Sequence, residues 1–350
     1  MNRGVIAITN AVGAGLRNIN AAIFSNDAGA EITIDNTDQE GIVNENDAQF
    51  NNGGNILLKN ISSHGVANDG SISSFQDTRF LNEGGTITME NTIGAHGVYN
   101  HLGNFVNSGA ISIEGTGKVS LTARDGLHSA GVGYKFVNTG DITLGNEIGG
   151  DGLRIGSYFQ NYTTGNIEIN SAGPENLGYS FGASILVTDS LINEGRIRII
   201  DNTHGKGMLI FSDSAFVENR QEGSIRISST LGAGIELVGS PFLNNGTVTF
   251  DAGIGSEAIK GPEIFTNQGE VWGVGTIDGT AFVNQGTILP GHASVSPTGI
   301  FNITDDYDHT LAVYEVEIAG NNGPGVVNGH DLITVGGPAV LGGTCNINFM

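Results

Sequence analysis

The sequence is poor in cysteine, in basic residues and in long apolar runs, and each deficit excludes a class of protein. Cys345 is the one cysteine, so no disulfide framework can form within the chain. The chain has 14 Lys and Arg against 36 Asp and Glu, and its formal charge of −22 argues against nucleic-acid and anionic-membrane partners. No apolar run approaches the roughly 18 residues of a membrane-spanning helix, so we expect no membrane insertion.

Helical periodicity is also missing, and a short motif takes its place. A bulky apolar residue is followed two places later by Asn, then by Gly and a short alternating strand, as in "FLNEGGTITM" at 80 and "FVNQGTILP" at 282. Successive motifs are 17 (Phe265 to Phe282) to 32 (Phe159 to Leu191) residues apart, a spacing typical of solenoids. A weaker motif, Gly followed by an aliphatic or aromatic residue, lies between them and indicates a second strand in each repeat.

These repeats predict an all-β fold, a right-handed single-stranded parallel β-helix (β-solenoid) of about eleven coils. Equivalent residues of coils about 4.8 Å apart then form internal columns. The predicted apolar column is Phe24, Phe50, Phe80, Phe105, Phe136, Phe159, Leu191, Phe216, Phe242, Phe265 and Phe282. The predicted Asn column is Asn26, Asn52, Asn82, Asn107, Asn138, Asn161, Asn193, Asn244, Asn267 and Asn284.

Two details of the motif carry further predictions. We expect the Asn residues to adopt the left-handed conformation at a corner, and the Gly that follows to supply a positive φ. The repeat at Phe216 departs from the pattern because Asn219 comes one place late, and "ENRQE" is interpreted as a bulge. Residues 1–290 are therefore predicted to form the β-helix. Residues 291–350 are expected to be a C-terminal β segment that continues or caps it and is truncated.

The C-terminal part of the sequence carries the resemblance to a known group. "GTILPGHASVSPTGIFNI" at 286 and "HDLITVGGPAVLGGTCNINF" at 330 resemble signatures near the ends of bacterial cell-surface passengers, of the autotransporter or filamentous-adhesin type. The resemblance implies a secreted, surface-displayed adhesin or stalk, associated with the outer membrane, that contacts host, matrix or neighbouring cells. It also implies an extracellular protein or glycan partner and a longer chain with an export signal outside this segment.

Enzymatic activity is the alternative on the same scaffold. A polysaccharide lyase or glycoside hydrolase needs clustered carboxylates with a basic partner, whereas a non-enzymatic adhesin needs only a flat or loop-decorated face. The sequence assigns no catalytic residue and no cofactor, so the adhesin is the first hypothesis.

One column of the weaker motif is a candidate metal site. The residues before its Gly are Glu40, His64, His96, Ala130, Asp151, Leu177, Lys206 and Ala233. Glu40, His64 and His96 would fall on successive coils, and imidazole with carboxylate suits zinc. We expect no catalytic metal there, because Ala130 interrupts the column, turn side chains face water, and no carboxylate is present to orient a ligating His.

Overall fold

The computed structural model describes residues 1–70, 78–92, 95–116, 125–145, 148–170, 183–200, 205–254, 257–279, 281–291 and 298–350. Leu177 of the predicted turn column and residues 292–297 of the first end signature lie outside these ranges. The chain divides into two compact units, Met1–Leu191 and Ile192–Met350. The described residues form strands and turns without helices, so none of them belongs to a helix that could cross a membrane.

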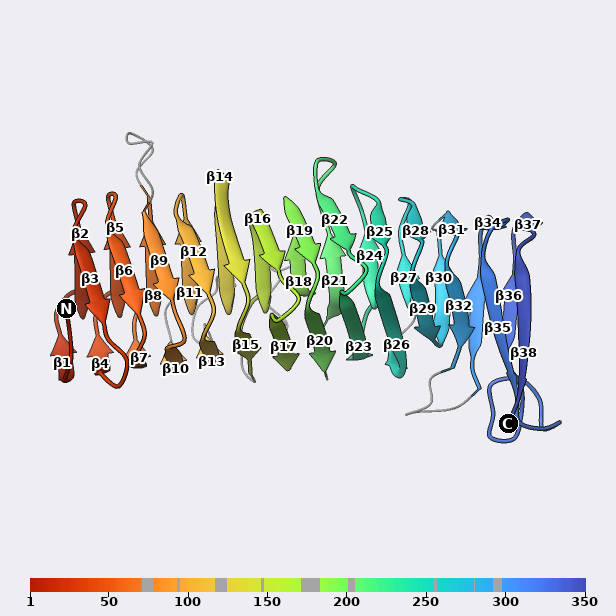
Figure 1. The fold of residues 1–350 in the computed structure, drawn as a ribbon, viewed down its shortest axis with the longest axis horizontal. Coiled ribbons are helices and arrows are strands. Elements are labelled where there is room, and N and C mark those ends of the chain that lie inside the picture. Colours follow the sequence, from red (N-terminus) through yellow and green to blue (C-terminus); the bar gives the residue numbers. More distant parts are fainter. Residues whose placement is uncertain are drawn as a thin grey trace. The chain divides into compact units, whose positions relative to one another are not determined.

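Each coil of unit 1 contributes up to three strands, and strands of successive coils pair in parallel (Figure 1). The first strands are β1 (Val5–Ala11), β4 (Glu31–Thr37), β7 (Asn55–Ile61), β10 (Thr86–Thr92), β13 (Ala110–Thr116), β15 (Asp141–Leu144) and β17 (Asn166–Asn170). The second strands are β2 (Leu16–Ile19), β5 (Ile42–Glu45), β8 (Val66–Asp69), β11 (Val98–His101), β14 (Leu127–Asn138), β16 (Leu153–Asn161) and β18 (Ala183–Val187). The third strands are β3 (Ile23–Asn26), β6 (Gln49–Asn52), β9 (Arg79–Asn82) and β12 (Asn104–Asn107), followed by the ends of β14 and β16; β19 (Ser190–Asn193) contains the boundary between the units.

Unit 2 repeats the same order. Its first strands are β20 (Arg196–Ile200), β23 (Ser224–Thr230), β26 (Thr247–Ile254), β29 (Glu270–Gly273), β32 (Thr287–Pro290), β35 (Val313–Ile318) and β38 (Thr344–Phe349). Its second strands are β21 (Lys206–Ile210), β24 (Ile235–Leu237), β27 (Ile259–Lys260), β30 (Gly275–Asp278), β33 (Ile300–Ile303) and β36 (Leu332–Val335). Its third strands are β22 (Phe216–Asn219), β25 (Phe242–Asn244), β28 (Phe265–Asn267), β31 (Phe282–Asn284), β34 (Tyr307–His309) and β37 (Ala339–Leu341). The predicted parallel β-helix is confirmed.

The third strands form the predicted internal stack. In unit 1 the ring centroids of consecutive Phe residues from Phe24 to Phe159 are 4.7–5.0 Å apart, and Phe50 to Phe159 are fully buried. In unit 2 Phe242 and Phe265 stack at 5.0 Å, and Tyr307 follows Phe282 at 5.6 Å. Stacked rings fill the interior at the coil spacing, which explains why the motif keeps one bulky apolar residue per turn.

Phe216 is the exception, and the prediction for it was wrong. Val217 pairs with Phe242 and is buried, whereas Phe216 is 49% exposed. Asn219 is fully buried, accepts a hydrogen bond from Asn193 and donates one to Asn244. The repeat therefore keeps its register, with Val217 in the stack and Asn219 at the ladder position two residues after it.

The Asn column forms a hydrogen-bonded ladder inside each unit. Asn82 Nδ2 donates to Asn107 Oδ1 at 2.7 Å, and Asn107 donates in turn to Asn138 at 2.8 Å. A second ladder, which the sequence analysis did not identify, runs along the second strands through Asn18, Asn44, Asn68 and Asn100. These amides pair buried side chains from coil to coil and so satisfy polar groups in a thin core.

The conformations expected at the corner residues are confirmed only in part: Gly29 and Gly84, after the ladder residues Asn26 and Asn82, have φ of 80° and 73°, but the ladder Asn residues themselves are not left-handed. The ladder residue Asn107 has no positive φ; left-handed Asn residues form another column at the ends of the first strands, Asn10, Asn36, Asn60 and Asn91, with φ of 52–60°. Gly109, after the ladder Asn, is required by close approach, because a Cβ there would lie 2.0 Å from the Gly85 carbonyl oxygen.

Candidate functional site

The second strands of unit 1 present one face to the core and one to the surface. In β8, Val66 and Asn68 point inward and are fully buried, so Ala67 and Asp69 point outward. Parallel pairing in register places the outward residues of successive strands in columns, and one column is Arg17, Val43, Ala67, Tyr99 and His128. A short side chain in such a column leaves a hollow between its longer neighbours.

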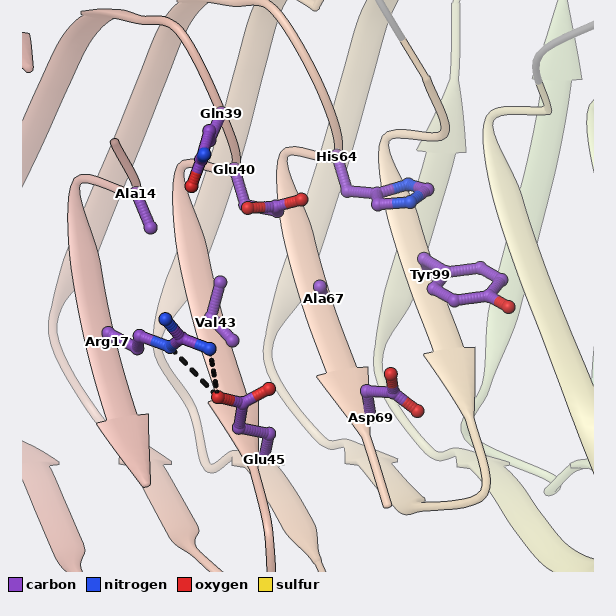
Figure 2. A pocket seen from close by; sticks show the side chains of 10 residues that line it. All are labelled: Ala14, Arg17, Gln39, Glu40, Val43, Glu45, His64, Ala67, Asp69 and Tyr99. Atoms are coloured by element: carbon purple, nitrogen blue, oxygen red, sulfur yellow. Dashed lines mark hydrogen bonds and ion pairs between the residues drawn. The ribbon is translucent and has the colours of Figure 1, made fainter. Parts of the chain in front are cut away.

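A pocket of about 220 Å³ lies over Ala67 (Figure 2). The polar residues that line it are Arg17, Gln39, Glu40, Glu45, His64, Asp69 and Tyr99. They come from β2, β5, β8, β11 and the turns that precede them, so the pocket belongs to four consecutive coils of one unit. Three carboxylates against one guanidinium give it a negative balance.

Each carboxylate of the pocket already has a partner. Arg17 Nε donates to Glu45 Oε1 at 2.8 Å, and the Ser63 hydroxyl donates to Glu40 Oε1 at 3.0 Å. His101 Nδ1 lies 2.9 Å from Asp69 Oδ1. These contacts orient the carboxylates as acceptors on a rigid sheet.

Aromatic rings form one wall of the pocket. The ring centroids of His64 and Tyr99 are 4.6 Å apart and nearly parallel, and Tyr99 lies 5.6 Å from His101. Burial, together with the negative charge of Asp69, raises the pKa of the Tyr99 hydroxyl, which therefore stays a hydrogen-bond donor at neutral pH.

The structure places two of the three predicted metal candidates, Glu40 and His64, in this pocket. Backbone bonds confirm that they share a turn column with His96, since the amides of Gly41 and Gly65 donate to the carbonyls of His64 and His96. His64 and His96 stack with centroids 5.3 Å apart.

The next member of that column is Asp125, and the prediction of Ala130 was wrong. Gly97 N donates to the Asp125 carbonyl, whereas Ala130 pairs with His101 at the far end of the strand. The expectation that the turn side chains face water is met only in part, because Glu40, His64 and His96 are half-buried and the next member, Asp125, is 1% exposed. A carboxylate thus lies beside His96, where the sequence analysis expected none. In the sequence both "DGLHS" at 125 and "AGVGY" at 130 match the motif, and the structure selects the first.

Comparison with known proteins adds no functional assignment. No protein-family model matches this chain, and a search of curated proteins found no match. Functional inference therefore depends on the described residues themselves.

Proposed function

We propose that this chain is a non-enzymatic, surface-displayed β-helical adhesin that binds a glycan on the outward face of the second strands of unit 1. The observation that supports this most directly is the pocket over Ala67, with its ordered acceptors and the Tyr99 ring. Binding sites are concave and combine apolar or aromatic surface with a few fixed polar groups. Display on a bacterial cell surface is part of the proposal and rests on the resemblance of the end signatures.

The chemistry of the pocket favours a neutral or amino-bearing sugar. Glu40, Glu45 and Asp69 accept hydrogen bonds, and sugar hydroxyls are donors in abundance. An excess of carboxylates over Arg17 disfavours sialylated or sulfated glycans by like-charge repulsion. The volume of about 220 Å³ is below the roughly 300–1,000 Å³ of typical small-molecule sites, so a single sugar ring is the expected occupant.

A glycan array followed by calorimetry tests the proposal. We expect binding of neutral or amino-bearing glycans and a loss of at least about tenfold in affinity for Tyr99→Ala and for Asp69→Asn, since a good polar or stacking contact contributes about 1.4 kcal/mol or more. Asp213→Asn, an exposed carboxylate of unit 2, is the matched control. Binding that all three variants retain would place the ligand elsewhere and contradict the proposal.

A carbohydrate-active enzyme is the second candidate, and one observation favours it. The pocket brings several carboxylates and Arg17 together, which is the constellation that glycosidases and lyases need. The adhesin ranks first because each carboxylate is already paired. Release of reducing or unsaturated ends from a polysaccharide panel, abolished in Glu40→Gln and in Glu45→Gln, would reverse this ranking.

A further inference from the structure

We propose that His96, Asp125 and His128 bind one divalent transition-metal ion, with Zn²⁺ as the first candidate. The three residues come from two consecutive coils: His96 from the turn before β11, Asp125 from the turn before β14, and His128 from β14 itself. The proposal does not depend on a glycan ligand, because none of the three residues lines the pocket over Ala67.

The distances fit a small metal ion. Asp125 Oδ2 lies 3.3 Å from His96 Nδ1 and 3.2 Å from His128 Nδ1. One ligand atom from each residue lies within 4.8 Å of the other two, and among the described residues no other group of three His, Cys, Asp or Glu meets this condition. Bonds of about 2.0–2.1 Å to tetrahedral zinc separate the ligand atoms by about 3.3–3.4 Å, which matches both distances from Asp125 Oδ2.

Burial and hydrogen bonding favour a cation beside the Asp125 carboxylate. Asp125 is 1% exposed, and its Oδ2 accepts no hydrogen bond from the described residues, whereas its Oδ1 accepts one from the Asp151 amide at 3.0 Å. A buried carboxylate oxygen without a donor is costly unless a positive charge lies beside it.

The histidine tautomers follow from their contacts. The Asp125 amide donates to His96 Nδ1 at 3.0 Å, which assigns the proton of the neutral ring to Nε2. His96 Nε2 lies 3.3 Å from His128 Nδ1, which is therefore the acceptor. The lone pairs of both Nδ1 atoms near Asp125 Oδ2 therefore accept hydrogen bonds from N–H donors. A metal ion bound at these atoms replaces the two N–H···N contacts with metal–nitrogen bonds and releases the Asp125 amide.

The neighbouring structure holds the ligands in place. Asp125 is fixed by the Asp151 amide, and the His128 ring packs edge-on against Tyr99 with centroids 5.5 Å apart. His64 stacks on His96 but belongs to no such ligand group among the described residues.

Two imidazoles and one carboxylate favour zinc or a similar transition metal over Ca²⁺ or Mg²⁺, which prefer oxygen ligands. Three protein ligands leave a coordination position for water or an external ligand.

Metal titration of the chelator-treated, tag-free chain tests the proposal. We expect calorimetry with ZnCl₂ to give one ion per chain, and CoCl₂ to give the visible absorption of a four-coordinate site. Asp125→Asn keeps the Oδ1 acceptor for Asp151 but removes the charged ligand, and His128→Ala removes one nitrogen. Loss of a residue that only hydrogen-bonds to a metal ligand typically lowers metal affinity by roughly 10–100-fold. Because these two variants remove a ligand itself, each should weaken zinc binding by more than that.

His101→Ala is the matched control, since His101 lies on the same face but contacts Asp69 instead. It should retain one zinc per chain and the cobalt spectrum. Circular dichroism and the metal-free thermal midpoint verify that each variant is folded. Absence of zinc binding to the folded wild-type chain, or equal binding by wild type and the folded Asp125→Asn and His128→Ala variants, would overturn the proposal.

Discussion

The ladder Asn residues illustrate how one side chain connects neighbouring coils. Asn107 Nδ2 donates to Asn138 Oδ1 at 2.8 Å and to the Asp141 carbonyl at 3.2 Å, while its Oδ1 accepts from Asn82. The amide therefore belongs to a continuous buried chain of hydrogen bonds rather than to a single pair. Removing one amide leaves buried groups of two other coils without partners.

Asn107→Ala should accordingly reduce the free energy of unfolding by about 1–3 kcal/mol, which is the cost of unsatisfied buried polar groups. Asn321→Ala, at an exposed position, should change it by less than about 0.5 kcal/mol. Urea denaturation of the two variants measures the difference. Equal midpoints would mean that the ladder contributes nothing to stability.

The residue types alone were sufficient to predict most of the aromatic stack and the Asn ladder of the third strands, but not the register of every repeat. The motif repeats an apolar residue and Asn at a fixed offset, so Phe136 and Asn138 could be placed directly. At Phe216 the aromatic residue was taken as the reference point, although the Asn ladder determines the register: Asn219 has to reach Asn193 and Asn244. A buried amide tolerates displacement less than an apolar site that accepts either Phe or Val.

The candidate site was predicted only in part, for a related reason. Glu40 and His64 lie in the pocket, as neighbours in the turn column, because the coils before them keep a similar length. Before β14 two stretches match the motif, and the prediction aligns "AGVGY" at 130 in place of "DGLHS" at 125. Spacing between motifs varies with turn length, so a local match cannot tell which of two glycines lies in the column. Only the backbone bond from Gly97 to Asp125 identifies it.

At the level of single strands, β22 provides a direct test of register. Val217 is 2% exposed and pairs with Phe242, whereas Phe216 is 49% exposed. Val217→Ala should cost about 1.5–3 kcal/mol, typical of a buried valine, and Phe216→Ala less than about 1 kcal/mol. Thermal or urea unfolding of both variants gives the comparison. A larger loss for Phe216→Ala would restore the register that the sequence motif predicted.

Asp331 connects strands in unit 2 and has an unusual environment. Its Oδ1 accepts from the Gly299 amide and its Oδ2 from the Glu317 amide, both at 2.8 Å, and the side chain is 4% exposed. Burial raises the pKa of this carboxyl from 3.8 to about 6, despite the two amide donors, which lower it. The folded state therefore binds the proton more tightly than the unfolded state does.

The stability that protonated Asp331 contributes should be fully present below about pH 4 and lost as the pH rises through about 6. The shift corresponds to about 3 kcal/mol. Asp331→Asn cannot titrate, so the difference in unfolding free energy between wild type and this variant should change by most of that amount between pH 4 and pH 7. Urea denaturation at both pH values measures it, and other groups cancel in the difference. A difference that stays constant would show that Asp331 has the same pKa in both states.

At the scale of the whole molecule, charge is the dominant feature. The chain carries a formal charge of −22 at pH 7 and has 14 basic residues with which to offset 36 acidic ones. Parallel pairing in register places residues of successive coils about 4.8 Å apart, well inside the roughly 10 Å screening length at 0.1 M salt. Folding therefore brings like charges closer than they are in the unfolded chain, and self-repulsion lowers the stability of the compact state.

Salt should therefore stabilise this protein at neutral pH. We expect the thermal midpoint at pH 7 to rise by a few degrees when NaCl is increased from about 0.01 M to about 0.5 M, because the screening length falls from about 30 Å to a few ångströms. At pH 4.5, close to the sequence pI of about 4.5, the net charge is near zero and the same addition of salt should change the midpoint much less. Comparing the effect of salt at each pH separates screening from the titration of individual groups such as Asp331. A midpoint that falls with salt at pH 7 would mean that the ion pairs, such as Arg226 with Asp251, outweigh the repulsion among the carboxylates. A rise of equal size at both pH values would mean that the salt does not act by screening the net charge.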